Sequence, residues 1–147
     1  MLRCASTRAI RVGRLGTIRL RPGYYLYIGS AFGPGGLRAR VAHHHYRAKR
    51  PHWHVDYLRR YARLESVWYA SGARREHDWA AKVAAMPGAA MVLPGFGSSD
   101  CRCETHLYWF VESPVAELRG VVGGESAVIM EPGSHFHRRL HVQRESR

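Results

Sequence analysis

The pattern of apolar and polar residues predicts a small domain built from short strands and helices. The clearest strand covers residues 23–29, where aromatic and β-branched residues alternate as they do when the two faces of a strand have different environments. Tyr25 and Tyr27 share one of these faces. The glycine-rich segment 29–36 ends the strand. From Leu37 an apolar stripe at helical spacing predicts a helix that packs on the sheet.

Shorter patterns predict the remaining elements. In chain order they are a hairpin at 10–20, a short helix at 52–58, a strand at 65–69, a helix at 74–86, and strands at 91–93 and 105–111. After Pro114 the pattern weakens, and we expect a tail with one strand at 127–130.

These elements predict an α/β domain, more narrowly an α+β domain, with a small and mostly antiparallel sheet of three or four strands flanked by helices. A chain of 147 residues has the length of one domain. We place this domain at residues 8–112 and a C-terminal extension of unknown role at 113–147. The sequence shows no membrane-spanning apolar run and no secretory leader pattern, so we expect a cytoplasmic protein with no membrane partner.

The positive charge is concentrated in one half of the chain. Residues 1–60 hold 13 of the 23 Lys and Arg residues but only one of the 11 acids, so this half carries the whole net charge of +12. A general preference for arginine over lysine explains the residue type but not the one-sided distribution. We therefore expect nucleic acid, in the form of DNA, as the partner. The expected contacts are Arg38, Arg47, Lys49, Arg50 and Trp53.

The three cysteines are too few for a disulfide framework, which agrees with a reducing compartment. Cys101, Cys103 and His106 offer half of a zinc site. The Cys-x-Cys spacing differs from the usual two-residue spacing of structural zinc sites, so further ligands would have to come from His52, His54 or Asp56. We favour a tight loop with packed thiols over this zinc site.

Three blocks of sequence resemble a known nuclease family. They are GYYLYIGSAFGPGGLRAR, HWHVDYL and GFGSSDCRCETHL, and they occur within residues 10–110. The Tyr-Ile-Gly tripeptide followed by a leucine and an arginine resembles the second half of the GIY-YIG nuclease signature. The three blocks together resemble the Uri-type branch of that superfamily, a set of small proteins regarded as endonucleases. The resemblance implies a GIY-YIG-like fold and hydrolysis of phosphodiester bonds.

Such hydrolysis needs neutralisation of phosphate charge, a proton acceptor and, in most cases, a divalent cation. Arg40 suits the phosphate, and Tyr27 can accept or relay a proton if a cation lowers its pKa. His44 lies four residues after Arg40 and can assist proton transfer or hold a phosphate. Glu76 stands where the family signature carries its single catalytic glutamate, so it is the expected ligand of Mg²⁺ or Mn²⁺, with Asp78 as the second choice.

The sequence departs from the family pattern at its first motif. No Gly-x-Tyr strand precedes the hairpin at 10–20, so we expect the first strand of the fold to be truncated, with Tyr25 as the nearest substitute for the missing tyrosine. His43 stands in place of a second arginine. The alternative is therefore a catalytically inactive module that binds nucleic acid on the same fold, with stacking from Tyr24, Trp53 or Tyr57. A zinc-binding structural domain is a third possibility.

Overall fold

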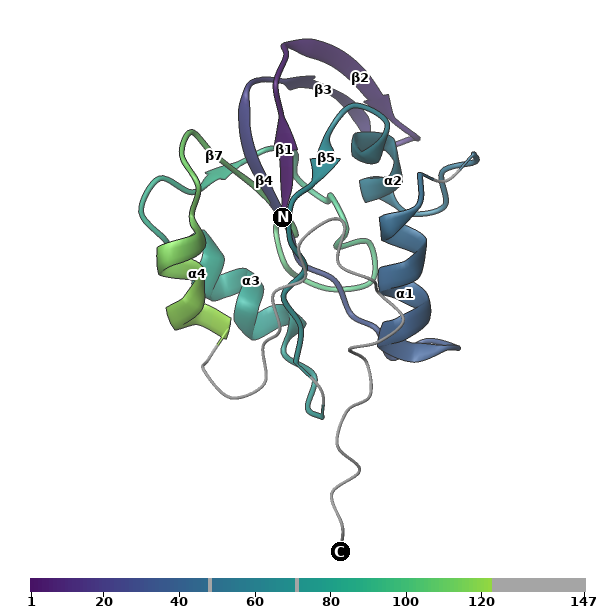
Figure 1. The fold of residues 1–147 in the computed structure, drawn as a ribbon, viewed down its shortest axis with the longest axis vertical. Coiled ribbons are helices and arrows are strands. Elements are labelled where there is room, and N and C mark those ends of the chain that lie inside the picture. Colours follow the sequence, from purple (N-terminus) through teal and green to yellow (C-terminus); the bar gives the residue numbers. More distant parts are fainter. Residues whose placement is uncertain (48, 71, 123–147) are drawn as a thin grey trace, which may run out of the picture.

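The computed structural model describes residues 1–47, 49–70 and 72–122 (Figure 1). One antiparallel sheet has the strand order β5-β1-β4-β7-β6, and β2 and β3 pair as a separate hairpin. The strands are β1 (Leu2–Cys4), β2 (Arg8–Val12), β3 (Gly16–Leu20), β4 (Gly23–Tyr27), β5 (Arg63–Leu64), β6 (Ala90–Met91) and β7 (Leu107–Phe110). The helices are α1 (Gly36–His45), α2 (His54–Arg59), α3 (Glu76–Ala84) and α4 (Val115–Val122). The mixed α+β class is as predicted, with more strands in the sheet than the predicted three or four.

Strand β4 lies at the centre of the sheet, between β1 and β7. Its alternating side chains enter two separate apolar clusters, as the sequence pattern predicts. Tyr25 and Tyr27 belong to the cluster on one face, whereas Leu26 and Ile28 belong to the cluster on the other. This alternation fixes which face of the sheet receives the Tyr27 hydroxyl.

Different elements cover the two faces of the sheet. The Tyr25 face packs against the β2–β3 hairpin, helix α2 and the loop that contains Phe96. The opposite face packs against α3 and α4, which Figure 1 shows side by side next to the sheet. Each helix presents residues such as Val83 or Leu118 at helical spacing, so burial of these stripes holds the helices in place.

A short first strand is present before the hairpin, in agreement with the predicted truncation. β1 pairs antiparallel with β4, with Leu2 opposite Tyr25 and Cys4 opposite Gly23. The strand has only three residues, which is too short to show an alternating pattern. It contains no tyrosine. Tyr25 does not replace that tyrosine, because its buried hydroxyl is bound to the backbone NH and carbonyl groups of Arg21.

Two further expectations from the sequence are wrong. The predicted strand at 65–69 is displaced to β5, at Arg63–Leu64, and residue 67 forms an isolated bridge only. The predicted tail after Pro114 begins as helix α4, whose Leu118 and Val122 are buried against the sheet and α3. The strand predicted at 127–130 lies outside the described residues.

We expect replacement of Leu118 to test whether α4 is part of the core. Leu118→Ala removes a side chain that is 3% exposed, so it should lower the free energy of unfolding by about 2–4 kcal/mol. Glu117→Ala, on the exposed face of the same helix, should change it by less than about 0.5 kcal/mol. Urea denaturation of both variants measures the difference. Equal, small effects would show that α4 contributes nothing to the fold.

Candidate active site

A cleft of about 300 Å³ opens at the end of β4, between the starts of α2 and α3. Residues from four elements and three loops form its wall: Tyr27, Ser30, Arg40, His52, Trp53, His54, Glu76, Gly97, Ser99 and Asp100. Three of the four predicted catalytic residues, Tyr27, Arg40 and Glu76, therefore line one cavity. They come from β4, α1 and α3, so only the tertiary fold brings them together.

Tyr27 and Arg40 form the polar floor of the cleft. An Arg40 Nη donates a hydrogen bond to the Tyr27 hydroxyl over 3.1 Å. Gly29 permits this approach, because a Cβ at that position would lie 3.0 Å from the guanidinium and 3.2 Å from the Tyr27 ring. Burial raises the pKa of Tyr27, and the neighbouring Arg40 only partly offsets this effect. The phenol is therefore protonated at neutral pH, contrary to a role that needs a lowered pKa, and its proton remains available for donation to a ligand.

Trp53 holds the other side of the Arg40 guanidinium. The guanidinium carbon lies 4.6 Å from the centre of the indole ring, within range of a cation–π contact. The Trp53 ring also meets His43 edge-on, at 4.4 Å between ring centres. Through these contacts Trp53 acts here as a support for Arg40. Stacking on a nucleic-acid base, as the sequence predicts for Trp53, would require these contacts to rearrange.

Asp56 ties helix α1 to the beginning of α2. Its buried carboxylate accepts hydrogen bonds from the backbone NH groups of His52 (2.8 Å) and Trp53 (2.9 Å) and lies 3.0 Å from His43 Nε2. Burial alone would raise the pKa of the Asp56 carboxyl, but its imidazole neighbours and the two backbone NH groups hold that pKa well below its usual range. The group is therefore a fixed anion that positions Trp53.

His44, the fourth predicted catalytic residue, lies behind the cleft rather than in its wall. Its ring meets Tyr27 edge-on, with 6.1 Å between ring centres, and its Nδ1 is 3.8 Å from Asp56, which is too long for a hydrogen bond. Burial lowers the pKa of His44, so the imidazole is neutral. In this geometry His44 supports Tyr27 and does not reach a ligand in the cleft.

Glu76 is the first residue of α3, and its side chain is 22% exposed. One carboxylate oxygen lies 3.2 Å from Nδ1 of the fully buried His106. Asp100, from the loop before β7, lines the same cleft and supplies a second carboxylate. Asp78, the second choice for a metal ligand, instead forms an exposed pair with Lys82 over 2.8 Å and does not line the cleft.

The remaining basic residues predicted to bind nucleic acid lie outside the cleft wall. They are exposed residues on α1 and in the segment between α1 and α2: Arg38, Arg47, Lys49 and Arg50. Arg38 shares α1 with Arg40, and the other three lie in the segment that leads from α1 to the cleft residues His52 and Trp53.

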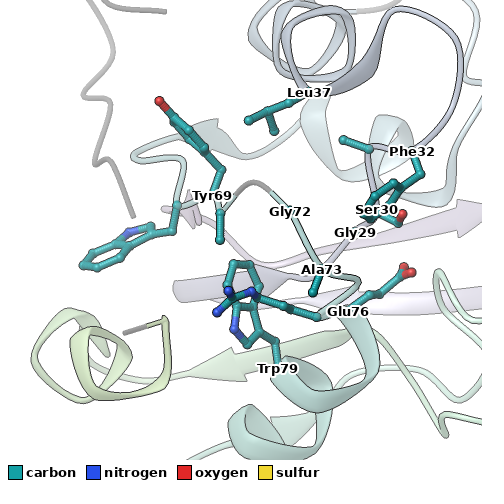
Figure 2. Close-up of a pocket in the computed structure, with 13 residues that line it drawn as sticks. Gly29, Ser30, Phe32, Leu37, Tyr69, Gly72, Ala73, Glu76 and Trp79 are labelled. Atoms are coloured by element: carbon teal, nitrogen blue, oxygen red, sulfur yellow. The ribbon is translucent and has the colours of Figure 1, made fainter. Parts of the chain in front are cut away.

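A second pocket, of about 240 Å³, adjoins the cleft (Figure 2). Ser30 and Glu76 line both pockets, and Figure 2 shows their side chains on the side away from Tyr69 and Trp79. The rest of the second pocket is mostly aromatic and apolar. A polar cleft and an apolar pocket therefore meet at Glu76.

Comparison with known proteins identifies a family for this chain but does not identify an activity. A family model described as "Domain of unknown function DUF123" matches residues 1–124. The chain belongs to the DUF123 family. No curated protein and no solved structure gives a match. Within the residues described here, this DUF123 protein has no helix of the length and apolar character needed to span a membrane.

The cleft of this DUF123 protein is lined by five polar residues that the sequence analysis did not assign to its catalytic or nucleic-acid-binding site: Ser30, His52, His54, Ser99 and Asp100. Their only signal was their place inside the three blocks GYYLYIGSAFGPGGLRAR, HWHVDYL and GFGSSDCRCETHL. The backbone NH of Gly97 donates to His54 Nδ1 over 2.9 Å. Burial lowers the pKa of His54, so the neutral ring carries its proton on Nε2. His54 is thus a hydrogen-bond donor.

We expect Asp56→Ala to destabilise this DUF123 protein strongly, because two backbone NH groups and His43 would lose their buried anionic partner. The free energy of unfolding should fall by about 3 kcal/mol or more. Asp78→Ala is the matched control, since its exposed pair with Lys82 contributes less than about 0.5 kcal/mol. Chemical denaturation compares the two, and a similar effect of both changes would refute the role of Asp56.

The stability of the protein should fall as the pH drops below about 6.5. Burial lowers the pKa values of His44, His54 and His106, so the unfolded chain takes up protons that the folded chain does not. The three histidines make their full contribution to stability above the pKa that they have in the unfolded chain. This contribution is lost as the pH falls toward their lower pKa values in the folded protein. Urea midpoints between about pH 5 and about pH 8, at constant ionic strength, measure this slope. A midpoint that stays constant or rises toward pH 5 would contradict it.

Proposed function

We propose that this DUF123 protein is a metal-dependent endonuclease of the GIY-YIG type that hydrolyses phosphodiester bonds in nucleic acid, with DNA as the expected substrate. One observation carries the proposal: Tyr27, Arg40 and Glu76, from three distant parts of the sequence, line a single cleft. The positive charge of residues 1–60 supports a polyanionic substrate. The aromatic pocket beside the cleft supports nucleic acid in particular, because bases stack on aromatic side chains.

Arg40 is the proposed phosphate-binding group. Its guanidinium is permanently charged, and its planar fork suits the non-bridging oxygens on which negative charge increases during hydrolysis. The contacts with Trp53 and Tyr27 hold the fork in place before the substrate arrives. Electrostatic stabilisation of a transition state depends largely on charged and polar groups that are held in position before the reaction begins.

Tyr27 is proposed to donate its phenolic proton to the leaving oxygen of the scissile phosphate, and the Asp100 carboxylate in the same cleft is proposed to accept the proton of the attacking water. The Tyr27 oxygen already accepts a hydrogen bond from Arg40, so the phenolic O–H is the part that can reach a substrate oxygen. His54, which presents an Nε2–H, is a second donor in the cleft. Tyr27 and His54 can both stabilise an oxygen that becomes negative as the bond breaks.

The carboxylates of Glu76 and Asp100 suit Mg²⁺ or Mn²⁺, which prefer oxygen ligands. Glu76 is the proposed ligand because it lies beside Ser30 at the junction of the cleft and the aromatic pocket. The divalent ion would supply charge neutralisation to the leaving oxygen. Nδ1 of the fully buried His106 lies 3.2 Å from one oxygen of the Glu76 carboxylate.

A second candidate function is a nucleic-acid-binding module without catalysis. The observation that favours it is β1, which pairs with β4 but carries no tyrosine to join Tyr27. Both candidates predict binding that weakens with salt. Only the endonuclease predicts product formation that depends on a divalent ion and on Glu76.

The deciding experiment measures nicking of supercoiled plasmid with Mg²⁺ or Mn²⁺, and with EDTA. Glu76→Gln should lower the nicking rate by about 100-fold or more, because it removes an anionic ligand worth several kcal/mol of charge stabilisation. Affinity for the same DNA at fixed salt should stay equal or rise slightly, since one negative charge is lost.

Asp78→Asn is the matched control for this assay. It neutralises an acid two residues further along α3 that does not line the cleft, so it should retain the wild-type rate. Binding without nicking in the wild-type protein would favour the non-catalytic module. Equal nicking by wild type and Glu76→Gln would refute the proposed role of Glu76.

A further inference from the structure

A second group of metal-binding side chains lies next to Glu76 but outside the wall of the cleft. It consists of His77, from the first turn of α3, and Cys101 and Cys103, from the loop before β7. One ligand atom of each residue lies within 4.8 Å of those of the other two. The sequence alone favoured packed thiols here, because nothing in it indicates that His77 meets a loop that follows more than twenty residues later.

Backbone hydrogen bonds hold the two cysteines of this loop in position. Gly95 N donates to Glu104 O over 2.7 Å, and His106 N donates to Phe96 O over 2.7 Å, so both ends of the loop are fastened. Within it, Cys101 N donates to Ser98 O. The backbone of this loop requires a glycine at position 97, because a Cβ there would lie 2.8 Å from the Tyr27 ring. The thiols are therefore held by a fixed loop.

The geometry points to a zinc site made by His77, Cys101 and Cys103; we propose that this DUF123 protein binds one zinc ion there. Bond lengths of about 2.1 Å to nitrogen and 2.3 Å to sulfur in a tetrahedral site place the ligand atoms about 3.5–3.8 Å apart. The three ligand atoms reach these distances through side-chain rotations that shorten each separation by about 1 Å. Thiolate and imidazole ligands select zinc over Mg²⁺, so this site differs in chemistry from the one proposed at Glu76.

His106 is the nearest donor for the fourth position. Its Nε2 lies 3.5 Å from Cys101 Sγ, and its ring is fully buried. The other ring nitrogen, Nδ1, lacks a hydrogen-bond partner of good geometry among the described residues, although Glu76 is 3.2 Å away. Zinc on Nε2 would fix the proton on Nδ1, where a carboxylate partner commonly stabilises a metal-binding histidine. The zinc would then hold His106, and through it Glu76, in place.

The other group of potential metal ligands, His43, His44 and Asp56, is a weaker candidate. It contains no thiol, and the Asp56 carboxylate is already occupied by the backbone NH groups of His52 and Trp53. It provides an internal comparison for the experiment, because the two groups share no residue.

The test is metal retention by the full chain. Purified protein is loaded with zinc chloride, desalted through a weak chelator and analysed by atomic emission. We expect one zinc per chain in the wild type and loss of the metal in Cys101→Ser/Cys103→Ser. His77→Gln, an exposed change that leaves the fold intact, should also lose it. Cys4→Ser and His45→Gln are matched controls at residues outside the group and should retain the metal.

Cobalt substitution identifies the ligands independently. Co²⁺ in the wild type should show the absorption of thiolate-to-metal charge transfer and the bands of a tetrahedral centre, and both should vanish in the double cysteine variant. Glu76→Gln should weaken zinc binding about 10-fold, as loss of an outer partner does. A wild type that retains no zinc, or retention that is lost in His43→Gln and kept in the cysteine variant, overturns the proposal. Neither result depends on whether the cleft cuts nucleic acid.

Discussion

The buried carboxylate of Asp56 is the interaction on which the arrangement of the cleft depends. It joins the C-terminal part of α1, through His43, to the backbone at the start of α2. This connection places Trp53 against the guanidinium of Arg40, which in turn reaches the hydroxyl of Tyr27. An anion buried at the junction of two helices thus determines where a cation on one of them points. A neutral residue at this position would leave several donors unpaired in a low-dielectric setting.

The sheet and the glycines determine the other side of the cleft. Alternation along β4 sends Tyr27 to the face opposite α3 and α4, and Gly29 and Gly97 leave room for Arg40 and for the Tyr27 ring. Glu76 reaches this region only because it is the first residue of α3, at the end of the helix rather than along its buried stripe. The loop before β7 then contributes to both the cleft and the thiol group. The two proposed sets of metal ligands, which differ in chemistry, therefore adjoin at Glu76 and His106.

The sequence predicted the elements with strong periodicity and missed those that depend on partners distant in the chain. The strand with Tyr27 follows from an alternating apolar pattern, and the structure contains it. The helix with Arg40 is also present, but Val41 is its one buried residue, so the predicted apolar stripe does not form a packing face. The three residues of β1 are stabilised by pairing with β4 and β5, which no local pattern reveals. The sequence suggested Asp56 only as a possible zinc ligand, whereas the structure buries its carboxylate against His43 and the backbone at the start of α2. His77 becomes a candidate metal ligand only because the fold brings it close to Cys101 and Cys103, which are distant in the sequence.

The central claim is that Tyr27, Arg40 and Glu76 surround one phosphate. A crystal structure of the protein with Mn²⁺ and a phosphorothioate oligonucleotide, collected at a wavelength where manganese scatters anomalously, tests it most directly. The account predicts an anomalous peak next to the Glu76 carboxylate and a phosphate that contacts both the Arg40 guanidinium and the Tyr27 hydroxyl. An oligonucleotide bound away from the cleft, or manganese bound without Glu76, would contradict it.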